Sequence, residues 1–281
     1  MIKNKEYADK ANVEKEYFLG TGDSELERLA FQSEAWKPQT QHLWKAMAIG
    51  PASKILDLGC GPGYCTLDFS DMVGPEGKVV AIDISARFLD HLRASLRENR
   101  IENVKVQQLD IASDDISDSG FDFVFSRWLH QYVDNLDAVL QREIDCLKPG
   151  GKLGLLEVYN YRGVSFAPQS EIFNLINSQL VKFYYDSHRN VNAGANLPSL
   201  IEKHGARIES IENATPLAWT GETLWEWYRQ FSFSMVPRLV EAQLITESHK
   251  TAYEAEWGKY TEMKGAFLSV PAHVAIVASK R

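Results

Sequence analysis

The sequence predicts an α/β fold in which a doubly wound, parallel sheet is covered by helices on both faces. Two observations indicate this fold. From Lys54 onward, short apolar runs alternate with amphipathic segments, and the runs are apolar on both of their faces. Such runs are typical of strands that are buried between two layers of helices.

The strands are expected where the apolar runs stand. These are KILDL at 54–58, KVVAID at 78–83, NVKVQQ at 103–108, FDFVFS at 121–126 and KLGLLEV at 152–158. Between them, the segments 86–99 and 136–147 have the apolar spacing of helices. Strand–helix alternation of this kind provides the crossovers that parallel strands need.

The first 50 residues predict a helical cap. Ser24 and Glu27 have the spacing of a capping box, and Pro38 interrupts the helical pattern. We therefore divide the chain into an N-terminal helical cap over 1–50 and a main domain over 51–281.

The regular alternation of predicted strands and helices ends after Val158. Helices are expected over 171–188, 196–205, 221–235 and 240–262, and strand-like runs over 206–219 and 266–281. Pro271 is tolerable in the last run only at a bulge or a sheet edge. The helical residues between the last two strands favour one domain with lid segments at about 165–204 and 221–263.

The composition limits the partners of the protein. The 281 residues are 44% hydrophobic, and the formal net charge of −8 comes without a Lys/Arg-rich run. Because nucleic-acid binding needs a basic face, we expect no nucleic-acid partner. No run approaches the ~20 apolar residues of a membrane helix, so we expect no membrane partner. The three cysteines form no CxxC pair, which predicts neither disulfide nor metal and favours the cytoplasm.

Three glycines follow the first strand, in the segment GCGPG at 59–63. They let a ligand approach the backbone, and the helix after them offers free N–H groups. A P-loop would need Lys and then Ser or Thr where Tyr64 and Cys65 stand. A dinucleotide fingerprint would need Gly or Ala at Tyr64. The third candidate is a ligand with a cationic amino-acid end, because the carboxylate of Asp57 stands just before the turn.

Two further acids stand where the second and third strands end: Asp83 is the last residue of the second, and Asp110 follows the third. Asp83 stands where a carboxylate can accept both ribose hydroxyls, and Asp110 has Ile111 beside it. An acid next to an aliphatic side chain suits adenine, because the acid accepts from the exocyclic amine while the aliphatic group packs on the ring. Amine, ribose and adenine in this order describe S-adenosylmethionine. The simpler alternatives are that Asp83 caps the next helix and that Asp110 is a loop acid. Because Asp83 lies at a strand mouth, we expect its removal to affect folding little.

Residues 54–157 resemble the core of the class I S-adenosylmethionine-dependent methyltransferases. The similar motifs are ILDLGCGPG, VVAIDIS, QQLDI, FDFVFSRWLHQYVDN and CLKPGGKLGLLE, in that order. The segment YFLGTGDSELERLAFQ further resembles small-molecule members of the quinone and natural-product type. The resemblance implies a Rossmann-like, seven-stranded sheet whose last strand is antiparallel. It also implies S-adenosylmethionine as cofactor and S-adenosylhomocysteine as product.

The motifs and the resemblance together predict a cofactor site at the strand ends. Its residues are Tyr17, Arg28, Asp57, Gly59, Cys60, Gly61, Asp83, Ile84, Asp110, Ile111 and Arg127. Tyr17 and Arg28 belong to an N-terminal segment that folds over the cofactor in similar proteins, and Cys60 contributes its backbone. Arg127 either reaches the methionine carboxylate or pairs with an acid.

No catalytic residue is assigned from the sequence. Methyl transfer depends mainly on alignment of donor and acceptor in a dry pocket, so it needs no triad. His130 and His188 are each either a base near the methyl group or a packed residue. Aromatic residues gather between 219 and 233, where we expect most to pack as core and some, including Trp225 and Trp227, to face the acceptor.

The leading hypothesis is methylation of an O, N or C atom of a small, partly apolar or aromatic acceptor. A cofactor-binding protein of the same fold without transfer activity is the alternative. An NAD-binding oxidoreductase is disfavoured by Asp57 and Tyr64. A homodimer is left open as the assembly.

Overall fold

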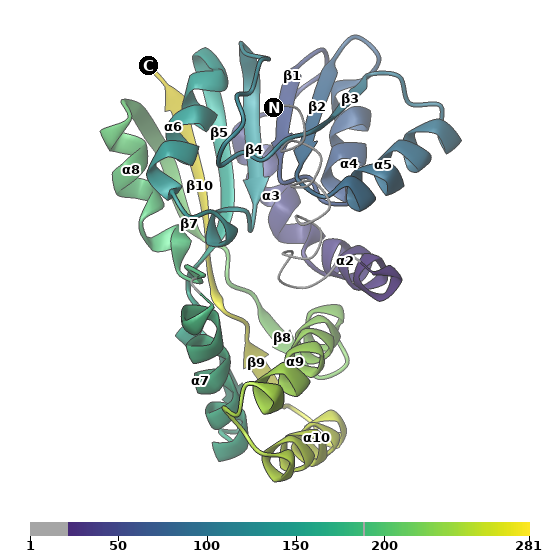
Figure 1. The fold of residues 1–281 in the computed structure, drawn as a ribbon, viewed down its shortest axis with the longest axis vertical. Coiled ribbons are helices and arrows are strands. Elements are labelled where there is room, and N and C mark those ends of the chain that lie inside the picture. Colours follow the sequence, from purple (N-terminus) through teal and green to yellow (C-terminus); the bar gives the residue numbers. More distant parts are fainter. Residues whose placement is uncertain (1–21, 188) are drawn as a thin grey trace, which may run out of the picture.

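The structure is a computed structural model that describes residues 22–187 and 189–281, so Tyr17 and His188 lie outside the described residues. A seven-stranded sheet with the order β3-β2-β1-β4-β5-β10-β7 forms its centre (Figure 1). Its strands are β1 (Lys54–Leu58), β2 (Lys78–Asp83), β3 (Val104–Gln108), β4 (Phe121–Arg127), β5 (Leu147–Asn160), β7 (Ala206–Asn213) and β10 (Ala272–Lys280). The strands from β3 to β5 pair in parallel, whereas β10 runs antiparallel to β5 and β7. The predicted α/β sheet with an antiparallel last strand is confirmed.

The strand order reverses between β1 and β4. β1 pairs with β2 on one side and with β4 on the other, and Leu58 at the end of β1 is opposite Ser126 of β4. The segments that leave these two strands therefore start side by side at one edge of the sheet. In doubly wound folds this switch point is where ligands bind.

Helices cover both faces of the sheet. They are α3 (Lys37–Met47), α4 (Tyr64–Val73), α5 (Ala86–Glu98), α6 (Leu136–Cys146) and α8 (Leu197–Lys203). Neighbouring residues of a strand point to opposite faces, so Ile55 of β1 packs in one cluster with residues of α3 and α4. Leu56 packs in another cluster with residues of α6 and α8. This two-sided burial explains the unbroken apolar runs in the sequence.

The N-terminal part of the described chain is helical, as expected, but it does not begin as predicted. Helix α2 (Asp23–Ala35) has Gly22 as its N-cap, and no side chain caps it. The predicted capping box at Ser24 and Glu27 is therefore wrong. Helix α3 follows directly and carries Pro38 in its first turn, where a missing N–H costs nothing.

A second group of elements, here called the helical body, lies below the central sheet in Figure 1. It contains α7 (Glu171–Asp186), α9 (Thr223–Glu241) and α10 (Glu247–Glu262). A three-stranded sheet, β6-β9-β8, belongs to it, with strands β6 (Ser165–Ala167), β8 (Leu217–Trp219) and β9 (Phe267–Ser269). The sequence predicts these helices but not this small sheet.

The small sheet divides two segments that the sequence predicts as single strands. The run 206–219 forms β7 and β8, and the run 266–281 forms β9 and β10. Pro216 and Pro271 lie between the two strands of each pair. Because proline has no N–H to donate to a ladder, each run changes sheets at its proline.

Aromatic side chains fill the helical body. Trp225, Trp257 and Phe173 are nearly or fully buried, and Trp225 lies 5.0 Å from Trp257 between ring centroids. The expectation that most of the aromatic cluster packs as core agrees with this arrangement. None of the helices in residues 22–187 and 189–281 is both long and apolar enough to cross a membrane.

Candidate functional site

The glycine turn after β1 is open toward ligands on one side and tightly packed on the other. Gly61 has a positive φ of 54°, and a Cβ placed there would meet no heavy atom within 4 Å. A Cβ at Gly63 would lie 2.3 Å from the Cδ1 atom of Leu92, and its φ is 91°. Gly63 therefore permits the packing of α4 on α5, and Gly61 leaves its backbone accessible.

A cavity of about 480 Å³ opens beside this turn and extends between α2 and α9. All predicted cofactor residues within the described chain line it: Arg28, Asp57, Gly59, Cys60, Gly61, Asp83, Ile84, Asp110, Ile111 and Arg127. Tyr17 lies outside the described residues, so its predicted contact remains a prediction. The strand ends and helix α2 thus bring together residues as far apart in the sequence as Arg28 and Arg127.

Asp57 is buried at the cavity wall, and its Oδ2 atom accepts a hydrogen bond of 2.6 Å from the Thr66 hydroxyl. Burial raises the pKa of Asp57 to about 7, against the opposing effects of the Thr66 bond and of Arg127. A carboxylate that is costly to ionise in this way gains from a cationic ligand beside it. Asp57 is therefore suited to an ammonium group.

Asp83 holds the backbone of the glycine turn. Its Oδ2 atom accepts from the Gly61 N–H and its Oδ1 atom from the Ser85 N–H, both at 2.8 Å. Burial raises the pKa of this carboxyl group, and the backbone donors oppose the rise. The N-cap of α5 is Ser85, not Asp83, so the capping alternative is wrong. The expected small effect on folding remains untested, and the two backbone N–H groups that depend on this side chain predict a loss of stability instead.

Asp110 and Ile111 follow β3 on the same edge of the sheet. The Oδ1 atom of Asp110 accepts from the Ala112 N–H at 2.8 Å, which turns the loop. Ile111 is buried and packs in the cluster of the α6 side of the sheet. An acceptor and an aliphatic wall therefore lie next to each other, as adenine binding would require.

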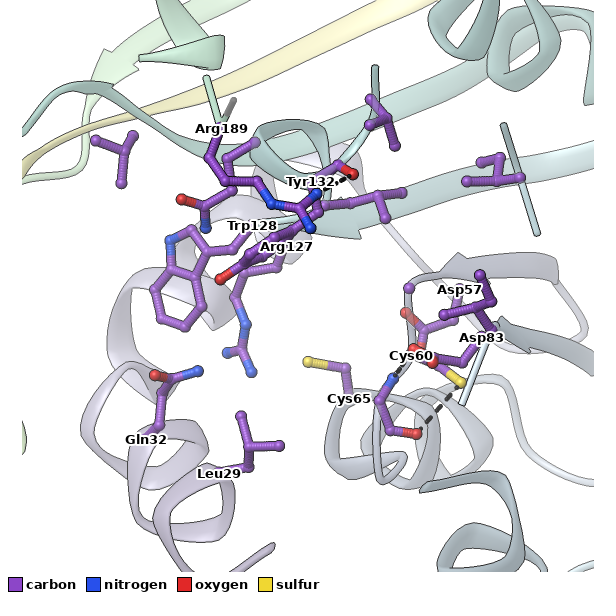
Figure 2. A pocket seen from close by; sticks show the side chains of 18 of the residues that line it. Leu29, Gln32, Asp57, Cys60, Cys65, Asp83, Arg127, Trp128, Tyr132 and Arg189 are labelled. Atoms are coloured by element: carbon purple, nitrogen blue, oxygen red, sulfur yellow. Dashed lines mark hydrogen bonds between the residues drawn. The ribbon is translucent and has the colours of Figure 1, made fainter. Parts of the chain in front are cut away.

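The two predicted arginines differ in their partners. Arg28 is buried and pairs with Glu25 through two bonds, of 2.7 Å from Nε and 2.6 Å from Nη2. Arg127 donates to the Thr40 hydroxyl at 2.9 Å and has no ion-pair partner among the described residues. Figure 2 shows Arg127 extending beside Trp128 toward helix α2. Arg127 is thus a cation of the cavity wall that makes no ion pair with a carboxylate in the described part of the chain.

Aromatic rings form the wall opposite the glycine turn. Trp128 and Trp227 are stacked, with centroids 6.2 Å apart and an interplanar angle of 11°. The further members of this wall are Tyr132, Tyr161, Tyr184 and Phe231. Trp227 lines the cavity as expected, whereas Trp225 does not and packs in the helical body instead.

Most of this aromatic wall is missed by sequence reasoning. Trp128 directly follows β4, and Tyr161 directly follows β5, as the first residue of the short helix η2 (Tyr161–Gly163). Because both residues directly follow the carboxyl ends of central strands, their positions in the sequence could have predicted that they line the cavity. Tyr184 of α7 and His273 of β10 gave no such signal, because each lies in an apolar run that reads as core.

His130 is fully buried and does not line the cavity. Its Nδ1 lies 2.9 Å from Oε1 of Glu157, and its Nε2 lies 3.1 Å from Oε1 of Glu143. These two carboxylates outweigh the effect of burial and raise the pKa of His130 to about 10. A protonated, enclosed imidazole cannot act as a base, so the structure favours a packed residue. His188 lies outside the described residues.

Comparison with known proteins agrees with this geometry. Residues 55–151 match the family model described as a methyltransferase domain. A demethylmenaquinone methyltransferase from Lactococcus lactis is 32% identical over 126 residues, 45% of this chain and 49% of that protein. A ubiquinone/menaquinone biosynthesis C-methyltransferase, UbiE, from Shewanella frigidimarina is 37% identical over 123 residues, 43% of this chain and 48% of that protein. The chain thus spans about half the length of the curated relatives it matches.

The fold has solved counterparts as well. Geranyl diphosphate C-methyltransferase from Streptomyces coelicolor is 18% identical and has a TM-score of 0.57, over 87% of this chain and 80% of that chain. A likeness at this level of identity concerns the fold. Residues 55–151 are therefore similar to a methyltransferase domain, and the chain shares the fold of a solved methyltransferase.

Proposed function

We propose that the protein transfers a methyl group from S-adenosylmethionine to a small, partly apolar or aromatic acceptor. One observation carries this proposal: a single cavity joins the acidic strand ends Asp57, Asp83 and Asp110 to an aromatic wall. The acidic part has the groups that the cofactor needs, and the aromatic part has room and chemistry for a second molecule.

In this proposal the cofactor lies along the edge of the sheet. Asp57 binds the ammonium group, and Arg127, which lacks a described ion pair, binds the methionine carboxylate. Asp83 keeps free lone pairs beyond its two backbone bonds and accepts the ribose hydroxyls. Asp110 and Ile111 bind adenine. The backbone of Gly61 lies against the ligand because nothing stands on its open side.

The chain then contributes alignment and the exclusion of water. The cofactor supplies an activated methyl group on a positively charged sulfur. Helices α2 and α9 pack against each other beside the cavity, which shields an acceptor held between them and the sheet. The stacked rings of Trp128 and Trp227 offer flat apolar surfaces to a planar acceptor. We also propose that the segments around 165–204 and 221–263 act as the lid and 1–50 as the cap of this site.

Calorimetry tests the cofactor assignment. We expect binding of S-adenosylmethionine and S-adenosylhomocysteine and much weaker binding of NAD and ATP. Asp71→Asn serves as the control, because Asp71 is an exposed acid of α4 outside the cavity. Tight NAD binding without binding of the methyl donor would overturn the proposal.

Transfer activity is tested separately. Incubation with a radiolabelled methyl donor and a metabolite extract should label a small, partly apolar product. Cofactor binding without any labelled product would favour the alternative of a binding protein that does not transfer.

A further inference from the structure

Two polar groups in the aromatic half of the cavity have no role in the cofactor site. His273 and Tyr161 both line the cavity and are 1% and 5% exposed. They come from neighbouring strands, since His273 of β10 is opposite Val158 of β5, three residues before Tyr161. Both residues carry polar atoms that the proposed cofactor site does not use, so these atoms are available to a second ligand in the cavity.

The tautomer of His273 is set by its own strand. Its Nδ1 lies 2.5 Å from the Pro271 carbonyl oxygen and donates its hydrogen there, because a carbonyl can only accept. Nε2 therefore carries the lone pair, and it has no hydrogen-bond partner in residues 22–187 and 189–281. Trp36 covers one side of the ring, with centroids 4.2 Å apart. Burial lowers the pKa of His273 to about 3, so the ring is neutral at physiological pH.

Tyr161 offers the complementary group. Its ring packs on Tyr184 at a centroid distance of 5.5 Å, and its hydroxyl has no hydrogen-bond partner in the described part of the chain. Burial raises its pKa well above the usual value, so it remains a neutral O–H donor. The aromatic half thus offers an acceptor atom, Nε2 of His273, and a neutral O–H donor, the hydroxyl of Tyr161.

We propose that the methyl acceptor is a hydroxylated aromatic or enolic molecule whose hydroxyl donates to Nε2 of His273 and whose second oxygen accepts from Tyr161. This inference rests on the proposed methyl transfer and adds the class of its acceptor. His273 is then a catalytic residue that takes the hydroxyl proton during transfer.

The step balances in atoms and charge. The O–H bond of the acceptor breaks, and its proton forms the N–H bond at Nε2. In attack through oxygen, the pair that remains there forms the new bond to the methyl carbon. In attack through a conjugated carbon, that pair becomes the carbonyl π bond, the π pair of the carbon forms the bond to the methyl carbon, and the product is the keto form, in which the carbon keeps its hydrogen. The methyl carbon leaves sulfur, which keeps the pair of the broken S–C bond and becomes a neutral thioether.

A weak base is sufficient in this position. As the acceptor gives its electron pair to the methyl group, its hydroxyl becomes far more acidic than in the free molecule. The positive charge on sulfur disappears in the same step in which the imidazolium forms, so the buried site never carries an additional charge. The proton leaves His273 when the product departs and water enters.

The test compares the binding of 1-naphthol and 1-methoxynaphthalene to the protein in the presence of S-adenosylhomocysteine. In 1-methoxynaphthalene a methyl group replaces the hydroxyl hydrogen, so this probe cannot donate to Nε2. We expect the protein to bind 1-naphthol about tenfold more tightly, as one hydrogen bond to a buried acceptor would give. His273→Asn keeps a donor for the Pro271 carbonyl but does not reach the position of Nε2, so this preference should vanish. Equal binding of the two probes by the unaltered protein would overturn the proposal.

Two further variants separate binding from proton transfer. His273→Gln places an amide oxygen near the position of Nε2, so it should keep the preference for 1-naphthol but methylate it at least tenfold more slowly. Tyr161→Phe should weaken binding of 1,4-dihydroxynaphthalene and leave the affinity for S-adenosylhomocysteine unchanged. His42→Asn is the control, since His42 is exposed and pairs with Glu212 outside the cavity.

The outcomes remain distinct from a failure of the proposed function. If S-adenosylmethionine does not bind to the unaltered protein, the function itself is wrong. If it binds and His273→Asn keeps both the naphthol preference and the methylation rate, only the assignment of His273 is wrong. Melting temperatures of all variants identify any loss that comes from misfolding.

Discussion

The indole N–H of Trp227 donates a hydrogen bond of 3.1 Å to the Oε1 atom of Gln32, which joins helix α9 to helix α2 across 195 positions of sequence. The same Oε1 atom accepts from Arg28 at 2.9 Å. Trp227 also stacks on Trp128, which follows β4. One side chain therefore connects the helical body, the N-terminal helices and the switch point of the sheet.

Trp227→Phe should lower acceptor turnover more than cofactor affinity. The phenyl ring of the variant can still pack on Trp128, but the hydrogen bond from the indole N–H to Gln32 is lost. Helices α2 and α9 should therefore hold the acceptor less firmly. Steady-state kinetics and calorimetry of the same preparation measure both effects. A fall in cofactor affinity equal to the fall in turnover would contradict a role confined to the acceptor.

Trp225 is the matched comparison on the same helix. It lies in the core of the helical body and not on the cavity, so Trp225→Ala should act through stability. We expect a loss of about 3–5 kcal/mol in the free energy of unfolding, as for other buried aromatic residues. Urea unfolding measures this, and turnover per folded molecule should remain near that of the unaltered protein.

Binding of S-adenosylmethionine should weaken as the pH falls below about 7, which is the pKa of Asp57. Binding favours the ionised carboxylate, so below that pH a proton must leave before the ammonium group can pair. The dissociation constant should rise by up to about tenfold per pH unit. Calorimetry between pH 5.5 and 8.5 measures this.

Two controls isolate the ammonium contact. 5′-Methylthioadenosine lacks the amino-acid end of the cofactor, so its affinity should not follow this pH dependence. Asp57→Asn should remove the dependence for S-adenosylmethionine as well. An unchanged slope in this variant would assign the titration to another group.

Asp83→Ala should lose both cofactor affinity and stability. The affinity should fall by about 2–3 kcal/mol, because hydrogen bonds to a charged acceptor are the stronger ones. The free energy of unfolding should fall by about 1–3 kcal/mol, because the Gly61 and Ser85 N–H groups lose their acceptor. Calorimetry and urea unfolding separate the two, with Asp71→Ala as control. Full affinity in the variant would show that Asp83 does not bind the ribose.

The stabilising effect of His130 should disappear at alkaline pH. Its pKa is raised to about 10 in the folded protein, against 6.5 for the unperturbed group. The pKa of His130 is higher in the folded than in the unfolded protein. Its contribution to the free energy of unfolding is therefore complete below about pH 6.5 and is lost as the pH rises through 10. The difference in unfolding free energy between the unaltered protein and His130→Gln should therefore narrow from pH 6.5 to 10. A constant difference would mean that His130 is neutral in the fold.

The sequence predicts the central sheet well because its five parallel strands are each marked locally, whereas the runs 206–219 and 266–281 do not show where β7 and β10 separate from β8 and β9. The predicted bounds of β1 and β2 agree with the structure, since Gly59 follows β1 and Asp83 ends β2. Apart from Arg28 of α2, the predicted cofactor residues in the described chain lie at or near strand ends, so local pattern was sufficient to place them around one cavity.

Local sequence patterns do not predict the small sheet of the helical body or the acceptor side of the cavity. Strands β6, β8 and β9 have three residues each and pair over separations that no local pattern can reveal. The aromatic wall collects side chains from the segments that follow β4 and β5 and from α7 and α9, and His273 of β10 lies next to Trp128. His273 in particular has apolar neighbours along its strand, and only the fold shows that its ring borders the cavity.

The small sheet β6-β9-β8 also bears on how this protein could be re-engineered. Its three strands come from three separate stretches of chain, so the helical body is built from several segments of the sequence and is not a single insertion. A chimera that exchanges only residues 221–263 would leave α7 and Phe166 of β6 without native partners, because both pack against α9 and α10. To change which acceptors the protein methylates, single residues of the aromatic wall should therefore be substituted, and the segment 221–263 should not be exchanged as a whole.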